Sequence, residues 1–336
     1  MPDLFLGIPL ADRAEILQSI APAIGLPPHV LEKDVWVCWA LQSVFEMPDR
    51  LPIAFKGGTS LSKVFGAIRR FSEDIDLTID YTALSDGVDP LATEMSRTAI
   101  AKLTEKLRSA VAAHVRNVVA PHLVTVGREQ LHVELQIDVD EGGEELRIRY
   151  PSPYATGASY LRDSVLLEFG GRNTTLPNAQ HRITPYAAEH VGAVEFPAAM
   201  ATVLSPQRTF WEKATLIHSE CHRPQESSRA SAERISRHWS DLALLAQADI
   251  GVAALKDREL LAQVVKLKGI FFRSGFANYP ACLEGRFRLI PDEPLHADLA
   301  KDYAAMIESG MFMEPPSAFA DVMAQLRELE TQLNRV

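Results

Sequence analysis

The alternation of apolar and polar residues is most informative between residues 53 and 80. An apolar run, Ile53 to Phe55, meets Gly57 and Gly58, and a stretch that favours a helix continues from Ser60 to Ile68. From Asp74 to Asp80 apolar and polar side chains alternate at every position, which is the period of a half-buried strand. The pattern predicts a strand, a glycine turn, a helix and a second strand.

Helical periodicity precedes and follows this stretch. Residues 11–46 predict two helices separated at Pro27-Pro28, and residues 91–117 predict a long amphipathic helix without internal Pro or Gly. On the second of the early helices, Glu32, Lys33 and Asp34 are consecutive charged residues. We interpret them as a solvated turn of a helix whose other face is buried.

Alternating patterns return between the long helix and about residue 195. Residues 122–129, 131–141 and 145–152 predict strands, the last two joined as a hairpin across Gly142-Gly143, and residues 164–172 predict another. From about residue 197 the strand signals stop and helices dominate. The expected fold class is α+β, with an N-terminal helical segment (1–50), a sheet core (51–195) and a C-terminal helical domain (196–336).

Composition narrows the class of protein. The 336 residues provide ample apolar content for a core, and the formal net charge of −10 disfavours a general nucleic-acid coat while permitting a local basic patch. Cys38, Cys221 and Cys282 lack metal-binding spacing and are expected to be buried thiols. Without a membrane-length apolar run or a signal-peptide pattern at the start, we expect a cytoplasmic protein.

Candidate chemistry lies in the stretch from 57 to 76. Side chains two apart on a strand share a face, so Asp74 and Asp76 point the same way. Paired carboxylates suit Mg²⁺, which combines one or two of them with substrate phosphates. The turn at Gly57 and Gly58 allows backbone N–H groups, with the Thr59 and Ser60 hydroxyls, to approach a triphosphate.

The motif GGTSLSK followed by RRFSEDIDL resembles the AbiEii/AbiGii toxin family, a branch of the DNA polymerase β-like nucleotidyltransferase superfamily. The resemblance extends from about Glu32, where the family has a similar E-K-D-x-W wording, to the phrase KDYAAMIESGMF near the C-terminus. It implies a polymerase β-like sheet domain, a divalent metal (Mg²⁺ or Mn²⁺) and a nucleoside triphosphate substrate. Lys63, which closes GGTSLSK, is grouped with Gly57, Gly58, Thr59 and Ser60 as nucleotide-binding.

A third carboxylate on a neighbouring strand completes the metal site in the superfamily. Glu134, Asp138 and Glu168 are candidates. Glu168 lies inside an apolar run, where a charge is costly unless it is paired or metal-bound, and the toxin family has an acid followed shortly by Arg at this strand, as in Glu168 and Arg172. We choose Glu168 and keep the other two as alternatives.

The helical region contributes two further candidates. Lys213 lies at the edge of an apolar helical stripe, where it can reach a cleft or cover core with its stem. The resemblance places a phosphate-binding lysine on this helix, and the phrase RHWSDL resembles a family motif whose aspartate is functional. Asp241 would hold Lys213 or another basic residue in position. In the Ser/Arg-rich loop between these helices, Arg223 and Arg229 are candidate RNA or triphosphate contacts.

Together these features predict a metal-dependent nucleotidyltransferase. The resemblance implies a toxin of a toxin–antitoxin or phage-defence pair, with a cognate antitoxin, that transfers a nucleotide to RNA such as the 3′ end of tRNA. Transfer to a protein or a small molecule is the alternative activity. A non-catalytic, nucleotide-binding partner protein is the alternative outside enzymology.

Overall fold

The computed structural model describes residues 3–48, 50–154, 164–224 and 234–335. The chain divides into two compact units. The first comprises Met1–Asp89, Ala101–Leu204 and Gly310–Met313, and the second comprises Pro90–Ile100, Ser205–Ser309 and Glu314–Val336. The polypeptide therefore passes between the units several times.

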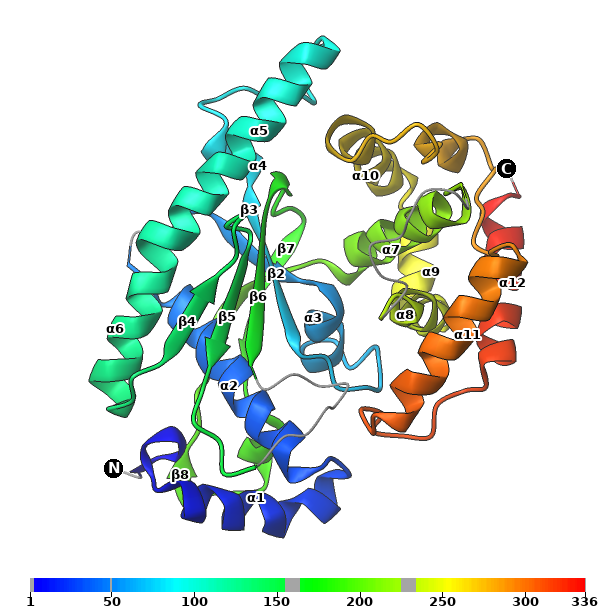
Figure 1. Cartoon of the computed structure of the whole chain (residues 1–336). Helices are drawn as coiled ribbons and strands as arrows, with labels where there is room; N and C mark the ends of the chain where they lie inside the picture. Colours follow the sequence, from blue (N-terminus) through cyan, green and yellow to red (C-terminus); the bar gives the residue numbers. More distant parts are fainter. Residues whose placement is uncertain (1–2, 49, 155–163, 225–233, 336) are drawn as a thin grey trace. The chain divides into compact units, whose positions relative to one another are not determined.

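A mixed sheet is the centre of the first unit (Figure 1). Within the described residues it has seven strands in the order β4-β5-β6-β3-β2-β9-β7. The strands are β2 (Ile53–Lys56), β3 (Asp74–Asp80), β4 (Gln136–Val139), β5 (Glu145–Arg149), β6 (Val165–Asn173), β7 (Asn178–Ile183) and β9 (Ala199–Leu204). A separate two-stranded pair joins β1 (Asp3–Leu4) and β8 (Val194–Glu195) in parallel.

Several predicted elements are confirmed in this unit. The glycine turn opens α3 (Gly57–Lys63) between β2 and β3, and β4 and β5 form the predicted antiparallel hairpin. Strands continue beyond residue 197, however, because β9 ends at Leu204. The expectation that strand signals stop there was wrong, since Ala199 and Ala201 are small residues that give a weak strand signal.

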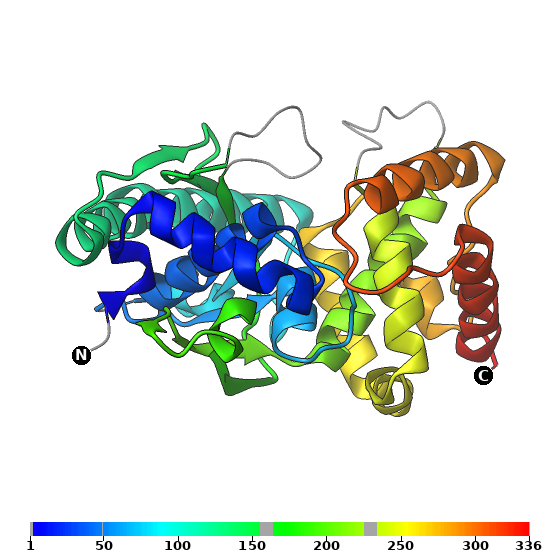
Figure 2. The same cartoon turned by 90° about the horizontal axis from the view of Figure 1, so that it is seen from below.

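Helices and short turns complete the first unit. They are η1 (Phe5–Gly7), α1 (Leu10–Ile24), α2 (Pro28–Phe45), α4 (Tyr81–Leu84), α5 (Arg97–His114, whose first residues belong to the second unit), the π-helix η2 (Val115–Val119), α6 (Ala120–Leu131) and η3 (Tyr186–Glu189). Figure 2 shows α1 lying along α2, which it contacts. In Figure 1, α5 and α6 form one long rod beside the sheet. The strand predicted at residues 122–129 was wrong, because these residues belong to α6.

The two faces of the sheet differ in character. On β3, Ile75, Leu77 and Ile79 are buried together on one face. Helices cover that face. A Cβ atom built on Gly171 of β6 would lie only 2.6 Å from the side chains of Leu84 on α4 and Val111 on α5. Asp74 and Asp76 alternate with these apolar residues and therefore lie on the opposite face.

The charged residues of α2 correct the sequence interpretation. Glu32, Lys33 and Asp34 are all buried rather than forming a solvated turn. Each is buried against a polar partner from another segment: Ser152, Glu73 and Lys63, respectively. Periodicity could not reveal these partners, which lie 29 to 120 residues away in the sequence.

The second unit is helical, as predicted for the C-terminal region. Its helices are α7 (Pro206–Cys221), α8 (Ser236–Gln247), α9 (Asp249–Lys256), α10 (Arg258–Phe271), η4 (Tyr279–Leu283), α11 (Glu293–Glu308) and α12 (Phe319–Leu333). α8 packs against α7, α9, α11 and α12 around the buried Trp211 and Trp239. This packing makes α8 the central helix of the unit.

Two expectations from composition concern the whole chain. Cys38, Cys221 and Cys282 are free and buried, which confirms the prediction of buried thiols. Among the described helices, none has the length and apolar character needed to cross a bilayer.

Candidate active site

Three carboxylates share one face of the sheet at the β3–β6 pairing. β3 and β6 run parallel, and Asp76 is in register with Glu168. Asp74 precedes Asp76 by two residues and is therefore on the same face. Asp74 is buried, whereas Asp76 and Glu168 are partly exposed. The sheet thus brings together the three residues chosen from the sequence.

The alternative acids lie farther from Asp76. Asp138 is on β4, at the edge of the sheet, and its carboxylate accepts a hydrogen bond of 2.9 Å from Arg149. Glu134 lies just before β4 and is exposed. Of the three candidates, Glu168 is the one on the strand next to β3.

The chemistry of this donor set fits a divalent metal ion. Asp74, Asp76 and Glu168 offer only carboxylate oxygens, the ligands that Mg²⁺ and Mn²⁺ favour. Within the described residues, no three His, Cys, Asp or Glu side chains already converge as a metal cluster. The backbone register therefore places three candidate ligands on one face, and closing them around an ion would require side-chain rotation.

The glycine turn fits closely against Asp76. Gly57 has φ of +80°, a left-handed conformation that glycine adopts without strain. A Cβ at this position would lie 1.8 Å from Oδ2 of Asp76, and one at Gly58 would lie 2.9 Å from Oγ of Ser72. Gly57 is therefore required by its conformation and by the space against Asp76, whereas a side chain at Gly58 would displace the Ser72 hydroxyl.

The hydroxyls of the turn are directed into the protein. The Thr59 hydroxyl donates to the Asp74 carbonyl at 2.5 Å, and the Ser60 hydroxyl donates to the Gly57 carbonyl at 2.9 Å. Both residues are fully buried. We expected these hydroxyls to approach a triphosphate, but in the structure they fasten the turn to β3 and to itself.

Lys63 also has an internal partner. Its ammonium lies 2.5 Å from the Asp34 carboxylate, and both side chains are almost completely buried. The ammonium is also 3.7 Å from the centre of the Tyr186 ring. The structure therefore places Lys63 in an ion pair beneath the turn, not at a surface that a nucleotide could reach, and we no longer include it among the phosphate-binding candidates.

Asp80, the last acid of the strand, has a separate role. It accepts hydrogen bonds from Thr82, from the Thr174 hydroxyl and from both the N–H and hydroxyl of Thr175. Burial would raise the pKa of Asp80, but these hydrogen bonds outweigh it and lower the pKa. Asp80 thus ties the end of β3 to the segment after β6.

In the helical unit, Lys213 and Asp241 form a buried ion pair. Nζ of Lys213 on α7 lies 2.9 Å from Oδ2 of Asp241 on α8 and 3.4 Å from Nδ1 of His238. The two side chains are therefore in contact, as the hypothesis that Asp241 holds Lys213 in position requires. His238, which belongs to the same RHWSDL phrase, was not assigned a role from the sequence.

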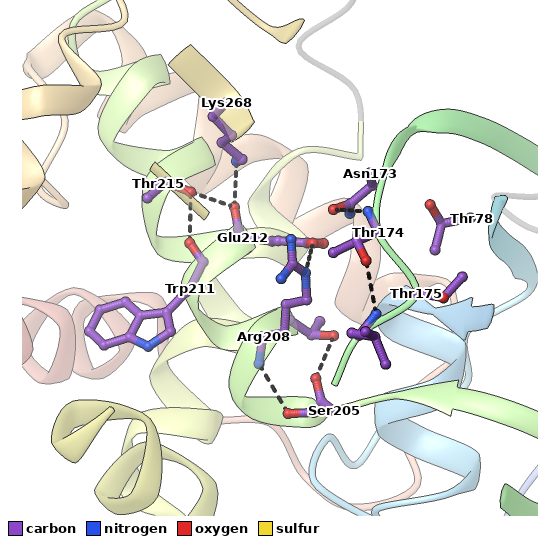
Figure 3. Close-up of polar contacts among 12 residues, drawn as sticks. Thr78, Asn173, Thr174, Thr175, Ser205, Arg208, Trp211, Glu212, Thr215 and Lys268 are labelled. Carbon is purple, nitrogen blue, oxygen red and sulfur yellow. Dashed lines mark hydrogen bonds and ion pairs between the residues drawn. The ribbon is translucent and has the colours of Figure 1, made fainter. Parts of the chain in front are cut away.

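Local interactions fix α7, which carries Lys213. Ser205 caps the helix by accepting from the Arg208 N–H at 3.4 Å, and Pro206 follows at the first turn. Farther along, Lys268 of α10 donates to the Glu212 carbonyl at 2.7 Å, and the Thr215 hydroxyl donates to the Trp211 carbonyl (Figure 3). These bonds hold the turns on either side of Lys213.

Asp302 is a structural residue that sequence reasoning missed. Its carboxylate accepts from the N–H groups of Arg234, at 2.5 Å, and Ser236, at 2.8 Å. It thus satisfies backbone donors at the beginning of α8, the helix of Asp241. No local signal could have revealed this role, because the two donors lie 66 and 68 residues away in the sequence.

The loop between α7 and α8 holds two arginines that were candidate RNA or triphosphate contacts. Arg223 forms an ion pair with Glu220 at 2.6 Å, and Arg229 lies outside the described residues.

Comparisons with known proteins agree with this architecture. A family model described as the nucleotidyl transferase AbiEii toxin of type IV toxin–antitoxin systems matches residues 39–325. No curated protein matches the chain. Among solved structures, MenT4, a nucleotidyltransferase toxin from Mycobacterium tuberculosis H37Rv, is similar with a TM-score of 0.50 at 16% identity, covering 98% of this chain and 91% of that one.

The structural similarity bears on the fold alone, and it confirms the expected α+β class. The family match spans most of the chain and includes the glycine turn, the paired aspartates, Glu168, Lys213 and Asp241. The chain therefore belongs to the AbiEii family of nucleotidyltransferase toxins.

Proposed function

We propose that this nucleotidyltransferase depends on Mg²⁺ and transfers a nucleoside monophosphate from a triphosphate to an RNA acceptor, such as the 3′ end of tRNA. The observation that carries the proposal is the register of Asp76 with Glu168, with Asp74 on the same face and Gly57 against the Asp76 carboxylate. Carboxylates suit a divalent metal ion and the backbone N–H groups of a turn suit phosphate, so the two side by side suit a metal-bound triphosphate.

Asp74, Asp76 and Glu168 are the residues that would hold the metal. Bound Mg²⁺ would neutralise charge on the triphosphate during in-line displacement of pyrophosphate. Because the Thr59 and Ser60 hydroxyls hold the turn in place, the backbone N–H groups of the turn are the donors we assign to the phosphates. Lys213 is 8% exposed against 2% for Lys63, and we retain it as the family-implied lysine that would supply positive charge to the phosphates, with Asp241 holding its ammonium.

Biologically, we propose a cytoplasmic toxin, in a toxin–antitoxin or phage-defence pair, that a cognate antitoxin restrains. The type IV family description supports the antitoxin. An RNA acceptor requires only a local basic surface, so the net charge of −10 is compatible with it.

The test is transfer of label from each α-³²P nucleoside triphosphate. The full-length chain is incubated with one triphosphate, Mg²⁺ and total cell RNA and protein, and the products are separated on a denaturing gel. We expect label in the tRNA band with one preferred triphosphate. EDTA and the variant Asp76→Ala should both abolish it.

Other outcomes would replace the proposed acceptor. Label in a protein band, lost in Asp76→Ala, would make protein nucleotidylation the activity. Label in a small product that the same variant loses would indicate a small-molecule acceptor. If the chain bound triphosphate yet labelled nothing under any condition, the catalytic proposal would give way to a nucleotide-binding partner protein.

A further inference from the structure

Helix α2 carries an unusual concentration of buried charge. Glu32, Lys33 and Asp34 are 1%, 3% and 0% exposed. Burying three consecutive charged side chains costs free energy unless each has a well-placed partner. The partners of Lys33 and Asp34 belong to the two segments that form the proposed active site.

Lys33 reaches the segment that begins β3. Its ammonium forms a buried ion pair with the carboxylate of Glu73, which is 3% exposed. Glu73 directly precedes Asp74, the first residue of β3. The pair therefore fixes the backbone at the start of the strand that carries Asp74 and Asp76.

Asp34 reaches the other segment, the helix that follows the glycine turn. Its Oδ1 lies 2.5 Å from Nζ of Lys63, the last residue of α3, and its Oδ2 accepts from the Tyr186 N–H at 2.7 Å. Burial alone would lower the pKa of Lys63, but the adjacent Asp34 carboxylate reverses this and raises the pKa above its ordinary value. Lys63 thus remains charged and bound to α2.

We propose that Lys33 and Asp34 are positioning residues, through which α2 holds the metal-binding strand and the phosphate-binding turn at a fixed separation. Adjacent residues of a helix point about 100° apart, so one helix can grip two different segments. α2 is itself held firmly, because Trp36 on it is fully buried and stacks on Tyr150 at 4.9 Å. This inference rests on the proposed function of those two segments.

A residue that positions metal ligands can be recognised by the loss of metal affinity when it is replaced. Removing a residue that orients a metal ligand weakens metal binding by roughly 10- to 100-fold. A merely structural ion pair would change thermal stability but leave the affinity of the folded protein unchanged. The two pairs should also differ from each other, since one supports carboxylates and the other supports the turn.

The experiment measures ligand binding by the full-length protein without turnover. Mn²⁺ binding is followed by the electron paramagnetic resonance signal of the free ion, and inorganic tripolyphosphate binding by calorimetry. The variants are Lys33→Met, Lys33→Arg, Asp34→Asn and the double variant Lys33→Met/Glu73→Leu. Glu32→Gln is the matched control, because Glu32 is equally buried on the same helix but bonds to Ser152.

We expect Lys33→Met to weaken Mn²⁺ binding roughly 10- to 100-fold, with Lys33→Arg retaining most of the affinity. Asp34→Asn should weaken tripolyphosphate binding more than Mn²⁺ binding. Glu32→Gln should change neither. The double variant leaves no unpaired charge from this pair and is expected to fold, yet it should bind Mn²⁺ as weakly as Lys33→Met does.

Two kinds of failure are distinguishable. If the folded double variant bound Mn²⁺ as tightly as the unmodified chain, the positioning role would be overturned while the metal site stood. If the unmodified chain bound Mn²⁺ no more tightly than Asp76→Ala, the proposed metal site would be overturned, and this inference with it.

Discussion

At position 57, both the backbone conformation and the space beside Asp76 require glycine. Its φ of +80° disfavours side chains, and its Cα faces the Asp76 carboxylate. We expect Gly57→Ala to displace that carboxylate and to lower label transfer by about 100-fold, the usual effect of misplacing a reacting group by about 1 Å. Transfer and the unfolding temperature are measured together.

Gly87 provides the matched control for this variant. It has the same φ of +80°, but nothing lies within 4 Å of a Cβ built there. Gly87→Ala should therefore cost about 1–2 kcal/mol of backbone strain and leave transfer unchanged. Equal activity in the two variants would show that the contact between Gly57 and Asp76 does not matter.

Single substitutions can also test which acidic residue is the third metal-binding carboxylate. Glu168 is in register with Asp76, whereas Asp138 pairs with Arg149 at the sheet edge and Glu134 is exposed. We expect Glu168→Gln to abolish label transfer, and Glu134→Gln and Asp138→Asn to retain it. Normal Mn²⁺ binding by Glu168→Gln would remove this residue from the ligand set.

At the scale of elements, the Lys213–Asp241 pair joins α7 to α8. The two side chains are 8% and 0% exposed, so breaking the pair leaves a buried charge without its carboxylate. Asp241→Asn should lower the free energy of unfolding by about 3–5 kcal/mol. The exposed pair of Asp138 with Arg149 is the control, and Asp138→Asn should cost less than about 1 kcal/mol.

A double variant separates stability from activity. Lys213→Met/Asp241→Asn removes both charges and should recover most of the lost stability, measured by urea unfolding. Transfer activity should remain absent, because Lys213 is the residue assigned to the phosphates. Recovery of both stability and activity would show that the pair is only a structural link between the helices.

Some secondary-structure elements were predictable from the sequence and others were not. Its alternation predicted β3 and β6, and its glycines predicted the turn that opens α3. Residues 122–129 misled because Val and Thr favour strands. In α6, however, Leu123, Gly127 and Leu131 are buried at every fourth position, so helical packing overrode that preference.

The same limit applies to the site. The shared face of Asp74 and Asp76 was predictable because strand geometry alone sets it, whereas Glu168 was chosen from its apolar surroundings and the family resemblance, and its position beside Asp76 follows from the pairing of β3 with β6. The inward direction of Thr59, Ser60 and Lys63 was not predictable, because it depends on acceptors in other segments, such as the Asp74 carbonyl and the Asp34 carboxylate. Local pattern carries no information about which distant group a polar side chain will meet.

At the scale of the whole molecule, the chain order conceals the division into units. Residues Gly310–Met313, from near the C-terminus, belong with the sheet unit. The Phe71 N–H donates to the Met311 carbonyl at 2.7 Å, and the Met313 N–H donates to the Arg69 carbonyl at 3.1 Å. The segment just before Asp74 thus depends on residues that no local reading of the sequence would place beside it.

Two buried groups, Glu32 in the sheet unit and His218 in the helical unit, should contribute to stability with opposite dependence on pH. Burial raises the pKa of Glu32, in the sheet unit, to about 7. A carboxyl with a raised folded-state pKa contributes stability below its unfolded pKa and loses it as pH rises through the folded value. Burial lowers the pKa of His218, in the helical unit, to about 4, although a hydrogen bond to Asn278 opposes this. Its contribution is present above the unfolded pKa and is lost as pH falls.

Calorimetry at pH 5 and pH 8 tests this opposition in the full-length chain. Relative to the unmodified protein, Glu32→Gln should gain roughly 2 kcal/mol on going from pH 5 to pH 8, because the unmodified carboxyl ionises inside the protein. His218→Gln, which keeps a donor for the Asn278 carbonyl, should gain a similar roughly 2 kcal/mol on going from pH 8 to pH 5. If the stabilities of both variants changed in the same direction with pH, the prediction would be contradicted. That result would mean that folding does not raise the pKa of Glu32 and lower the pKa of His218.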